Sequence, residues 1–213
     1  FLHALEARVP AVTLVVRRWF PTHAHGMRAG VAALRRAERT RSPATRADYL
    51  LFVDPDVIWR DPTALGRLLQ AVRTEDAVLA GEWRTGANRH PDIQASFVLV
   101  RRDTYDDPAT APPIDGGAPL YRMERSIVDR GLATVDFPAN RAGYVLHRGR
   151  TAVAATAGRP AHPYGRAVRV GPHYMGVPDG ARIWSEIEQA HAALLDPDAE
   201  PALVDLLAAR FDR

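Results

Sequence analysis

The sequence contains no lysine and no cysteine among its 213 residues, so all 28 side chains counted as lysine or arginine are arginine. The absence of lysine excludes a phosphate-binding loop of the G-x-x-x-x-G-K type and a Schiff-base mechanism. The absence of cysteine excludes disulfides, a thiol nucleophile and cysteine-ligated metal centres. Any chemistry must therefore use carboxylates, histidine, hydroxyl groups, arginine or the backbone.

Long apolar runs are also missing. The longest run in a strand-like segment covers residues 49–53, whereas a membrane-spanning helix needs roughly 20 apolar residues. We therefore expect no transmembrane segment. The first residues also lack the basic start and apolar stretch of a signal peptide, and by default we expect a cytoplasmic location.

Charge of one sign is not concentrated in this chain, because 28 basic residues stand against 25 acidic ones, for a net charge of +3. Such a small excess argues against a partner bound mainly by electrostatics, so we expect no nucleic acid. The hydrophobic fraction of 46% is enough for one sizeable core. We therefore predict a single domain over residues 1–213.

Apolar periodicity predicts an alternation of helices and strands. The predicted helices cover residues 2–9, 27–39, 62–72, 120–130, 181–195 and 199–210. The predicted strands cover residues 12–16, 48–53, 76–81, 95–100 and 132–137. This order is typical of an α/β sandwich with a parallel core, and we expect an antiparallel strand to join the sheet in the second half.

The strongest functional signal is Asp-Pro-Asp at residues 54–56, directly after the apolar strand at 48–53. Ligands of open α/β sheets bind beyond the carboxyl ends of the strands, and carboxylate oxygens suit Mg²⁺ or Mn²⁺. The alternative is that both aspartates only cap turns. The same tripeptide at residues 196–198 lies between two predicted helices with no strand before it, and there we expect a linker and helix cap.

An apolar strand, Asp-x-Asp and a proline-capped helix together resemble the metal-binding motif of GT-A-fold glycosyltransferases, particularly the family-2-like enzymes. The resemblance spans about residues 12–176. Its further elements, in order, are His25-Gly26, His90-Pro91 with the strand that follows, Asp115-Gly116 opening a helix that ends in Arg130-Gly131-Leu132, and the late histidines His147 and His173.

The resemblance implies an α/β fold of the GT-A (Rossmann-like) type, an α/β/α sandwich with a mostly parallel central sheet. In that arrangement residues 1–81 form the donor-binding half, about 82–176 the acceptor side, and 177–213 the C-terminal helices. GT-A sheets begin with a central strand, whereas this sequence opens in a predicted helix. Because a missing central strand leaves neighbouring backbone groups unpaired, we expect at least one strand to precede Phe1.

The resemblance also implies a function, the metal-dependent transfer of a sugar from a nucleotide-diphosphate donor to an acceptor hydroxyl. Mn²⁺ or Mg²⁺ would be the cofactor. Asp54 and Asp56 would hold the metal, with His147 or His173 contacting the metal or the diphosphate. Asp115 is the candidate catalytic base, which implies an inverting enzyme if it acts directly. The alternative for Asp115 is a turn residue before the following glycines.

Several other residues are candidates for contacts with the donor. The resemblance favours His25 and gives Asp54 a second possible contact, with the ribose. Arg101 and Arg148 are suited to the diphosphate, because a guanidinium pairs with phosphate oxygens in a bidentate way. Glu124 is a rival for the catalytic base, but its position inside a predicted helix favours a solvated partner of arginine.

Two other functions remain open from the sequence. A nucleotidyltransferase of related fold also binds nucleotides with carboxylates and a metal, but such enzymes usually carry a lysine in a glycine-rich loop, and no lysine is present. A non-catalytic, carbohydrate-binding GT-A-like domain is the alternative of a different class. Replacing Asp54 and Asp56 with alanine should leave its partner interaction intact, whereas the enzyme should lose turnover.

Overall fold

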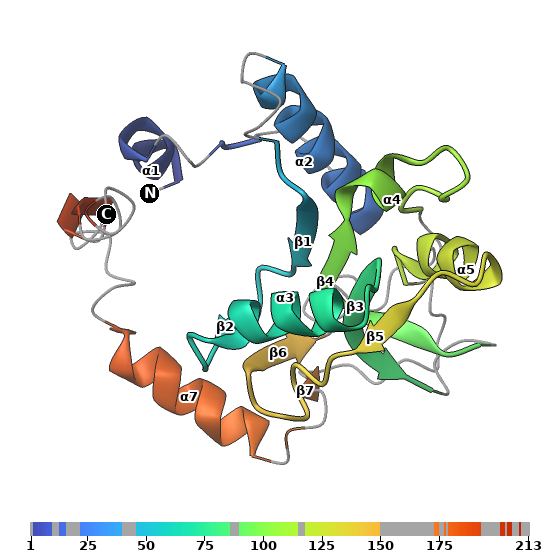
Figure 1. Cartoon of the computed structure of the whole chain (residues 1–213). Coiled ribbons are helices and arrows are strands. Elements are labelled where there is room, and N and C mark those ends of the chain that lie inside the picture. Colours follow the sequence, from blue (N-terminus) through green and yellow to red (C-terminus); the bar gives the residue numbers. More distant parts are fainter. Residues whose placement is uncertain are drawn as a thin grey trace, which may run out of the picture.

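The described part of the chain folds into a mixed α/β structure with a four-stranded sheet of order β1-β4-β3-β5 and a three-stranded sheet of order β2-β6-β7 (Figure 1). The computed structural model describes residues 2–9, 13–15, 22–39, 46–85, 90–114, 118–149, 173–174, 177, 179–192, 201–202, 204–205 and 209. Within these residues, no helix is long and apolar enough to cross a bilayer.

Helices and strands are interspersed along the described part of the chain. The helices are α1 (Leu2–Arg8), α2 (His23–Glu38), α3 (Ala64–Thr74), α4 (Arg102–Asp106), α5 (Tyr121–Asp129) and α7 (Gly180–Ala190). The strands are β1 (Tyr49–Val53), β2 (Val57–Trp59), β3 (Leu79–Arg84), β4 (Asp92–Arg101), β5 (Thr134–Asp136), β6 (Val145–Gly149) and β7 (His173–Tyr174).

The directions of the strands differ from the prediction of a mostly parallel central sheet. Among the described strands, β1–β4, β3–β4, β2–β6 and β6–β7 pair antiparallel, and only β3–β5 pair parallel. A parallel pair needs a crossover of a dozen or more residues, whereas β3 and β4 are joined by the short connection 85–91 and can pair only as neighbours running in opposite directions. The mixed α/β class is confirmed.

Most predicted elements are present. The helices predicted at the start of the chain, at 27–39 and at 120–130 correspond to α1, α2 and α5. Gly131 ends the last of these with a positive φ of 69°, a conformation that glycine adopts without strain. The strand predicted at 12–16 is wrong for Thr13–Val15, which form no strand, and its other residues lie outside the described part. The expected strand before Phe1 stays a prediction.

The four-stranded sheet is covered on both faces. One hydrophobic cluster packs α2 and α5 against the sheet through Val31, Met123 and Ile127. The other cluster packs α3 and the start of β6 on the opposite face through Leu68 and Val145 (Figure 1). The apolar stripes of three helices thus account for the two faces of the core.

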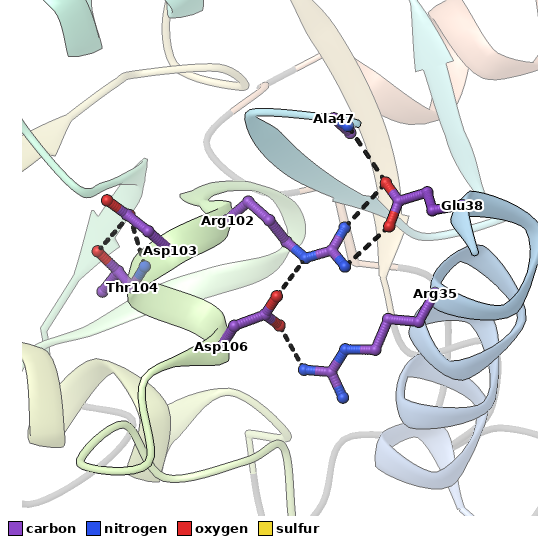
Figure 2. A network of polar contacts seen from close by, with 7 residues as sticks. All are labelled: Arg35, Glu38, Ala47, Arg102, Asp103, Thr104 and Asp106. Carbon is purple, nitrogen blue, oxygen red and sulfur yellow. Dashed lines mark hydrogen bonds and ion pairs between the residues drawn. The ribbon is translucent and has the colours of Figure 1, made fainter. Parts of the chain in front are cut away.

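A network of charged residues joins α2 and α4 at the start of β1 (Figure 2). Arg102 donates to both oxygens of Glu38, at 3.2 and 2.9 Å, and at 2.7 Å to Asp106. Glu38 also accepts from the backbone N–H of Ala47 at 3.2 Å, and Arg35 donates to the other oxygen of Asp106. The Arg102 and Glu38 side chains are only 13% and 5% exposed. Because these charges are largely removed from water, each depends on its partner.

We expect Arg102→Met to lower the free energy of unfolding at pH 7 by about 1–3 kcal/mol, the cost of leaving a hydrogen-bonded charge without its partner. Hydrogen bonds from Arg102 lower the pKa of Glu38 below its ordinary value. The pair therefore stabilises the fold above the ordinary pKa of glutamate and loses that effect as pH falls through the lowered pKa. Urea unfolding of wild type and Arg102→Met from pH 7 down to about pH 3 should show the difference in unfolding free energy shrinking once the pH falls below the ordinary pKa of glutamate.

The matched control for this prediction is Arg125→Met. Arg125 pairs with Asp129 one turn along α5, and the Asp129 side chain is 62% exposed. Exposed ion pairs of this kind contribute little to stability, so the free energy of unfolding of Arg125→Met should lie close to that of wild type. An Arg102→Met protein as stable as the control would contradict the structural role of the network.

Candidate metal centre

Asp54 and Asp56 lie at the carboxyl end of β1, where the chain turns out of the four-stranded sheet. The Asp54 N–H donates to the Ser96 carbonyl of β4 at 3.0 Å, and the Val57 N–H returns to the Asp54 carbonyl at 3.2 Å. The second contact closes a four-residue turn with Pro55 at its second position, where a fixed φ suits the turn. The Asp-Pro-Asp sequence thus forms a tight link between β1 and β2.

The turn delivers Asp56 to β6, a strand from a distant part of the sequence. Val57 pairs with His147 in the antiparallel β2–β6 ladder. The Arg148 N–H donates to the Asp56 carbonyl at 3.0 Å. Strand pairing therefore brings His147 beside two carboxylates that precede it by about 90 residues. The sequence pattern of either strand alone does not predict this contact.

Asp54, Asp56 and His147 form a cluster in which each offers one ligand atom, all within 4.8 Å of one another. His147 Nε2 lies 3.2 Å from Asp56 Oδ1 and 3.5 Å from Asp54 Oδ2. The three side chains are 5%, 16% and 13% exposed for His147, Asp56 and Asp54. Two carboxylates and one imidazole are a donor set that suits Mn²⁺ and related divalent ions. The residues present therefore fit a metal.

A second histidine lies on the outer side of the cluster. His23, in the first turn of α2, places its Nε2 2.8 Å from Asp54 Oδ1, although that buried oxygen receives no hydrogen bond of good geometry within the described residues. The contact with the Asp54 carboxylate raises the pKa of His23, with burial opposing it and Asp56 adding to it. A protonated His23 would therefore partly balance the two carboxylates.

Sequence reasoning missed His23 and chose His25 for a contact with the donor, which stays a prediction. The His25 backbone N–H donates to the Thr22 hydroxyl at 3.2 Å, which caps α2. This cap fixes the first turn of the helix, from which the His23 side chain reaches Asp54. The available signal was Thr22 directly before an amphipathic helix, because a threonine cap there places His23 at the first helical position.

His147 is held from behind by two buried polar side chains. Its backbone N–H donates to Asn140 Oδ1 at 3.1 Å, and the Asn140 N–H donates in turn to Glu82 Oε2 at 2.6 Å. Its ring Nδ1 lies 3.2 Å from Gln94 Nε2. Gln94 is 9% exposed and Asn140 1% exposed. His147 is therefore held both at its backbone N–H and at its ring.

The other predicted donor contacts do not join the cluster. Arg101 pairs with Tyr49, at the far end of β1 from Asp54, and its guanidinium contacts Asp103 at 2.8 Å and Asp76 at 3.5 Å. Arg148 follows His147, but its guanidinium extends to α7, 3.4 Å from Glu188 and 5.3 Å from the centre of the Trp184 ring. Both arginines thus face structural partners.

Two predicted residues are only partly covered by the structure or lie outside it. Asp115, the candidate base, lies outside the described residues. For His173 the backbone alone is described. It pairs with Gly149 in the β6–β7 ladder, two residues along β6 from His147. The prediction that His173 contacts a metal or diphosphate stays a prediction.

Glu124 differs from its expected role as a solvated partner of arginine. It is 1% exposed, its Oε2 accepts from the Ile93 N–H at 3.0 Å, and its Oε1 has no partner within the described residues. Burial, opposed by the Ile93 hydrogen bond and by Arg84 and assisted by nearby Asp92, raises the pKa of Glu124 from 4.5 to about 8. Glu124 packs beneath β4 and supports the strand that carries Gln94.

A groove of about 790 Å³ lies between α2 and β1, and its lining includes His23 and Val53 at the end next to the cluster. Its remaining walls are mostly apolar, with Met27, Val31 and Phe52 among them. The cluster therefore adjoins a concave surface of the size that small-molecule ligands occupy in proteins.

Comparisons with protein-family models, with curated proteins and with solved structures find no match for this chain.

Proposed function

We propose that the protein is a metal-dependent glycosyltransferase that moves a sugar from a nucleotide-diphosphate donor to an acceptor hydroxyl. The observation that carries the proposal is the junction of Asp54 and Asp56, at the end of β1, with His147 of β6. A strand that ends in two carboxylates beside a groove is where a diphosphate and its ion would bind in an α/β protein. The finer fold assignment, a GT-A sandwich, is part of the same proposal.

Asp54, Asp56 and His147 would hold Mn²⁺ or Mg²⁺. The ion would supply positive charge next to the leaving diphosphate, where negative charge builds as the sugar departs. His23, whose pKa is raised by Asp54, would add a second positive group near the same oxygens. The groove between α2 and β1 would give the donor an adjoining surface on the chain.

Asp115 is the proposed base of the reaction. The acceptor oxygen would form its bond to the anomeric carbon of the sugar as the bond from that carbon to the diphosphate breaks, and the acceptor proton would pass to Asp115. Direct attack of this kind inverts the anomeric centre.

A thermal-shift panel tests the proposal. UDP-, GDP- and TDP-sugars are each added to the protein with Mn²⁺ and without it. Binding at 100 times the dissociation constant contributes about 2.7 kcal/mol, which for a chain of this size raises the melting temperature by about 5–10 °C. We expect one nucleotide family to produce such a shift, and only when Mn²⁺ is present.

The outcomes separate the proposal from its alternatives. No shift with any nucleotide sugar, in the presence of Mn²⁺, would count against the proposal. A shift caused by nucleoside triphosphates in preference to nucleotide sugars would favour a nucleotidyltransferase. A shift with carbohydrate alone that needs no metal would favour a non-catalytic carbohydrate-binding domain.

A further inference from the structure

A chain of hydrogen bonds lies behind His147 and ends at a buried carboxylate. The Arg84 guanidinium donates through Nε to both oxygens of Asp92 at 3.0 Å and through a terminal nitrogen at 2.6 Å. Its other terminal nitrogen donates to Gln94 Oε1 at 2.7 Å. Gln94 Nε2 then lies 3.2 Å from His147 Nδ1. Asp92 is fully buried and the Arg84 side chain is 28% exposed.

This series of hydrogen bonds fixes the orientation of the Gln94 amide. A guanidinium carries only donors, so the amide atom that faces Arg84 must be the oxygen. The amide NH₂ group must then face His147. Turning the amide over would set NH₂ against the Arg84 guanidinium and lose a bond to a charged group, which is among the stronger hydrogen bonds in a protein.

The orientation of Gln94 selects the tautomer of His147. An NH₂ group only donates, so Nδ1 of His147 must accept, and in a neutral imidazole the single proton then sits on Nε2. Nε2 is the atom that faces Asp56 at 3.2 Å and Asp54 at 3.5 Å. The N–H therefore points at two carboxylates, and each polar atom of the ring has a suitable partner.

A metal ion needs a lone pair where this tautomer carries a proton. Metal-binding histidines usually donate their second N–H to an acceptor, which raises their basicity and fixes the ring. In this protein the second ring nitrogen of His147, Nδ1, faces a donor instead, the NH₂ group of Gln94, which Arg84 holds in place. Binding of a metal through Nε2 would move the proton to Nδ1, against the Gln94 NH₂ group.

We propose that Gln94, oriented by Arg84 and Asp92, is a positioning residue that holds His147 as the Nε2–H tautomer and thereby weakens the Asp54–Asp56–His147 centre for a free divalent ion. The part that concerns the metal rests on the proposed function, whereas the tautomer does not. The centre should therefore bind Mn²⁺ tightly only when further ligand atoms, such as diphosphate oxygens, complete the coordination of the ion.

Gln94→Glu tests the proposal, because a carboxylate at this position accepts from an Nδ1–H and frees Nε2. Long-range ¹H–¹⁵N NMR of the metal-free protein at pH 8 should show His147 as the Nε2–H tautomer in wild type and as Nδ1–H in Gln94→Glu. Titration with Mn²⁺ alone should show on the order of 10- to 100-fold tighter binding by the variant.

A double-mutant cycle separates the tautomer from the added charge. In a His147→Ala background the gain from Gln94→Glu should disappear, because it acts through the ring. A gain that persists there would overturn the proposal and assign the effect to charge. The wild-type spectrum needs no variant, and an Nδ1–H tautomer in it would overturn the proposal directly. Wild type that binds no Mn²⁺ even with a nucleotide diphosphate would instead count against the proposed function.

Discussion

Asp56→Asn should lose metal-dependent donor binding and lower turnover on the order of 10²- to 10⁴-fold. The amide keeps the size of the side chain but removes one of the two negative charges that would hold the ion. A bound metal contributes several kcal/mol of charge stabilisation to a reaction of this kind, and each 1.36 kcal/mol changes the rate tenfold. The measurements are Mn²⁺ titration in the presence of the donor found by thermal shift, and turnover of that donor.

Asp76→Asn is the matched control for this prediction. Asp76 is also an aspartate beyond an element end, with a side chain 98% exposed, and its positive φ of 46° is one that asparagine tolerates. The control should keep full metal binding and turnover. Equal losses in Asp56→Asn and Asp76→Asn would point to a general effect of the substitution and against a metal at the end of β1.

His23 also contacts the proposed metal centre, through Asp54. His23 lies 2.8 Å from Oδ1 of Asp54, whereas His147 lies 3.5 Å from the other oxygen, Oδ2. If the cluster binds a metal through Asp54, this contact competes with the ion for the Asp54 carboxylate. The cluster is thus built from one carboxylate shared between two histidines and a second carboxylate that faces His147.

The sequence predicted local features of this site and missed those that depend on strand pairing. The continuous apolar run of β1 and the Asp-Pro-Asp turn are local, so the carboxylates could be located from the pattern alone. An antiparallel strand was expected in the second half, but that it is β4 and that it pairs with β1 could not be predicted, because an apolar strand buried on both faces has the same pattern whether its neighbours run parallel or antiparallel. That direction places Arg101 at the far end of β1 from Asp54.

Buried polar residues were the least predictable part. Glu124 lies inside a helix that also carries Arg122 and Arg125, which is typical of a solvated face, yet the Glu124 carboxyl accepts a hydrogen bond from the backbone of β4. Gln94 gave no signal at all, because its role depends on Arg84 and His147, which lie on two other strands. Contacts between elements distant in sequence decide these roles, and local periodicity carries no information about them.

Glu124→Gln should stabilise the protein strongly at alkaline pH and hardly at all near pH 4.5. The pKa of Glu124 is raised from 4.5 to about 8 by burial. Between these values the folded protein keeps the proton while the unfolded chain releases it, so rising pH favours unfolding. At 1.36 kcal/mol for each pH unit, the wild type should lose roughly 4–5 kcal/mol of stability across this range. Glutamine resembles the protonated acid and should escape that loss.

The fold of wild type and Glu124→Gln is compared by urea unfolding at intervals between pH 5 and pH 8.5. The variant should retain the bond from the Ile93 N–H, since an amide oxygen accepts as the carboxyl does, and the two stabilities should diverge steadily as pH rises. Glu75→Gln, at the exposed end of α3, should follow the wild-type curve. Parallel curves for wild type and Glu124→Gln would mean that Glu124 ionises in the folded protein at its ordinary pKa. In that case water would have to reach the carboxylate, and the packing of α5 beneath β4 would be looser than the buried contacts of Glu124 require.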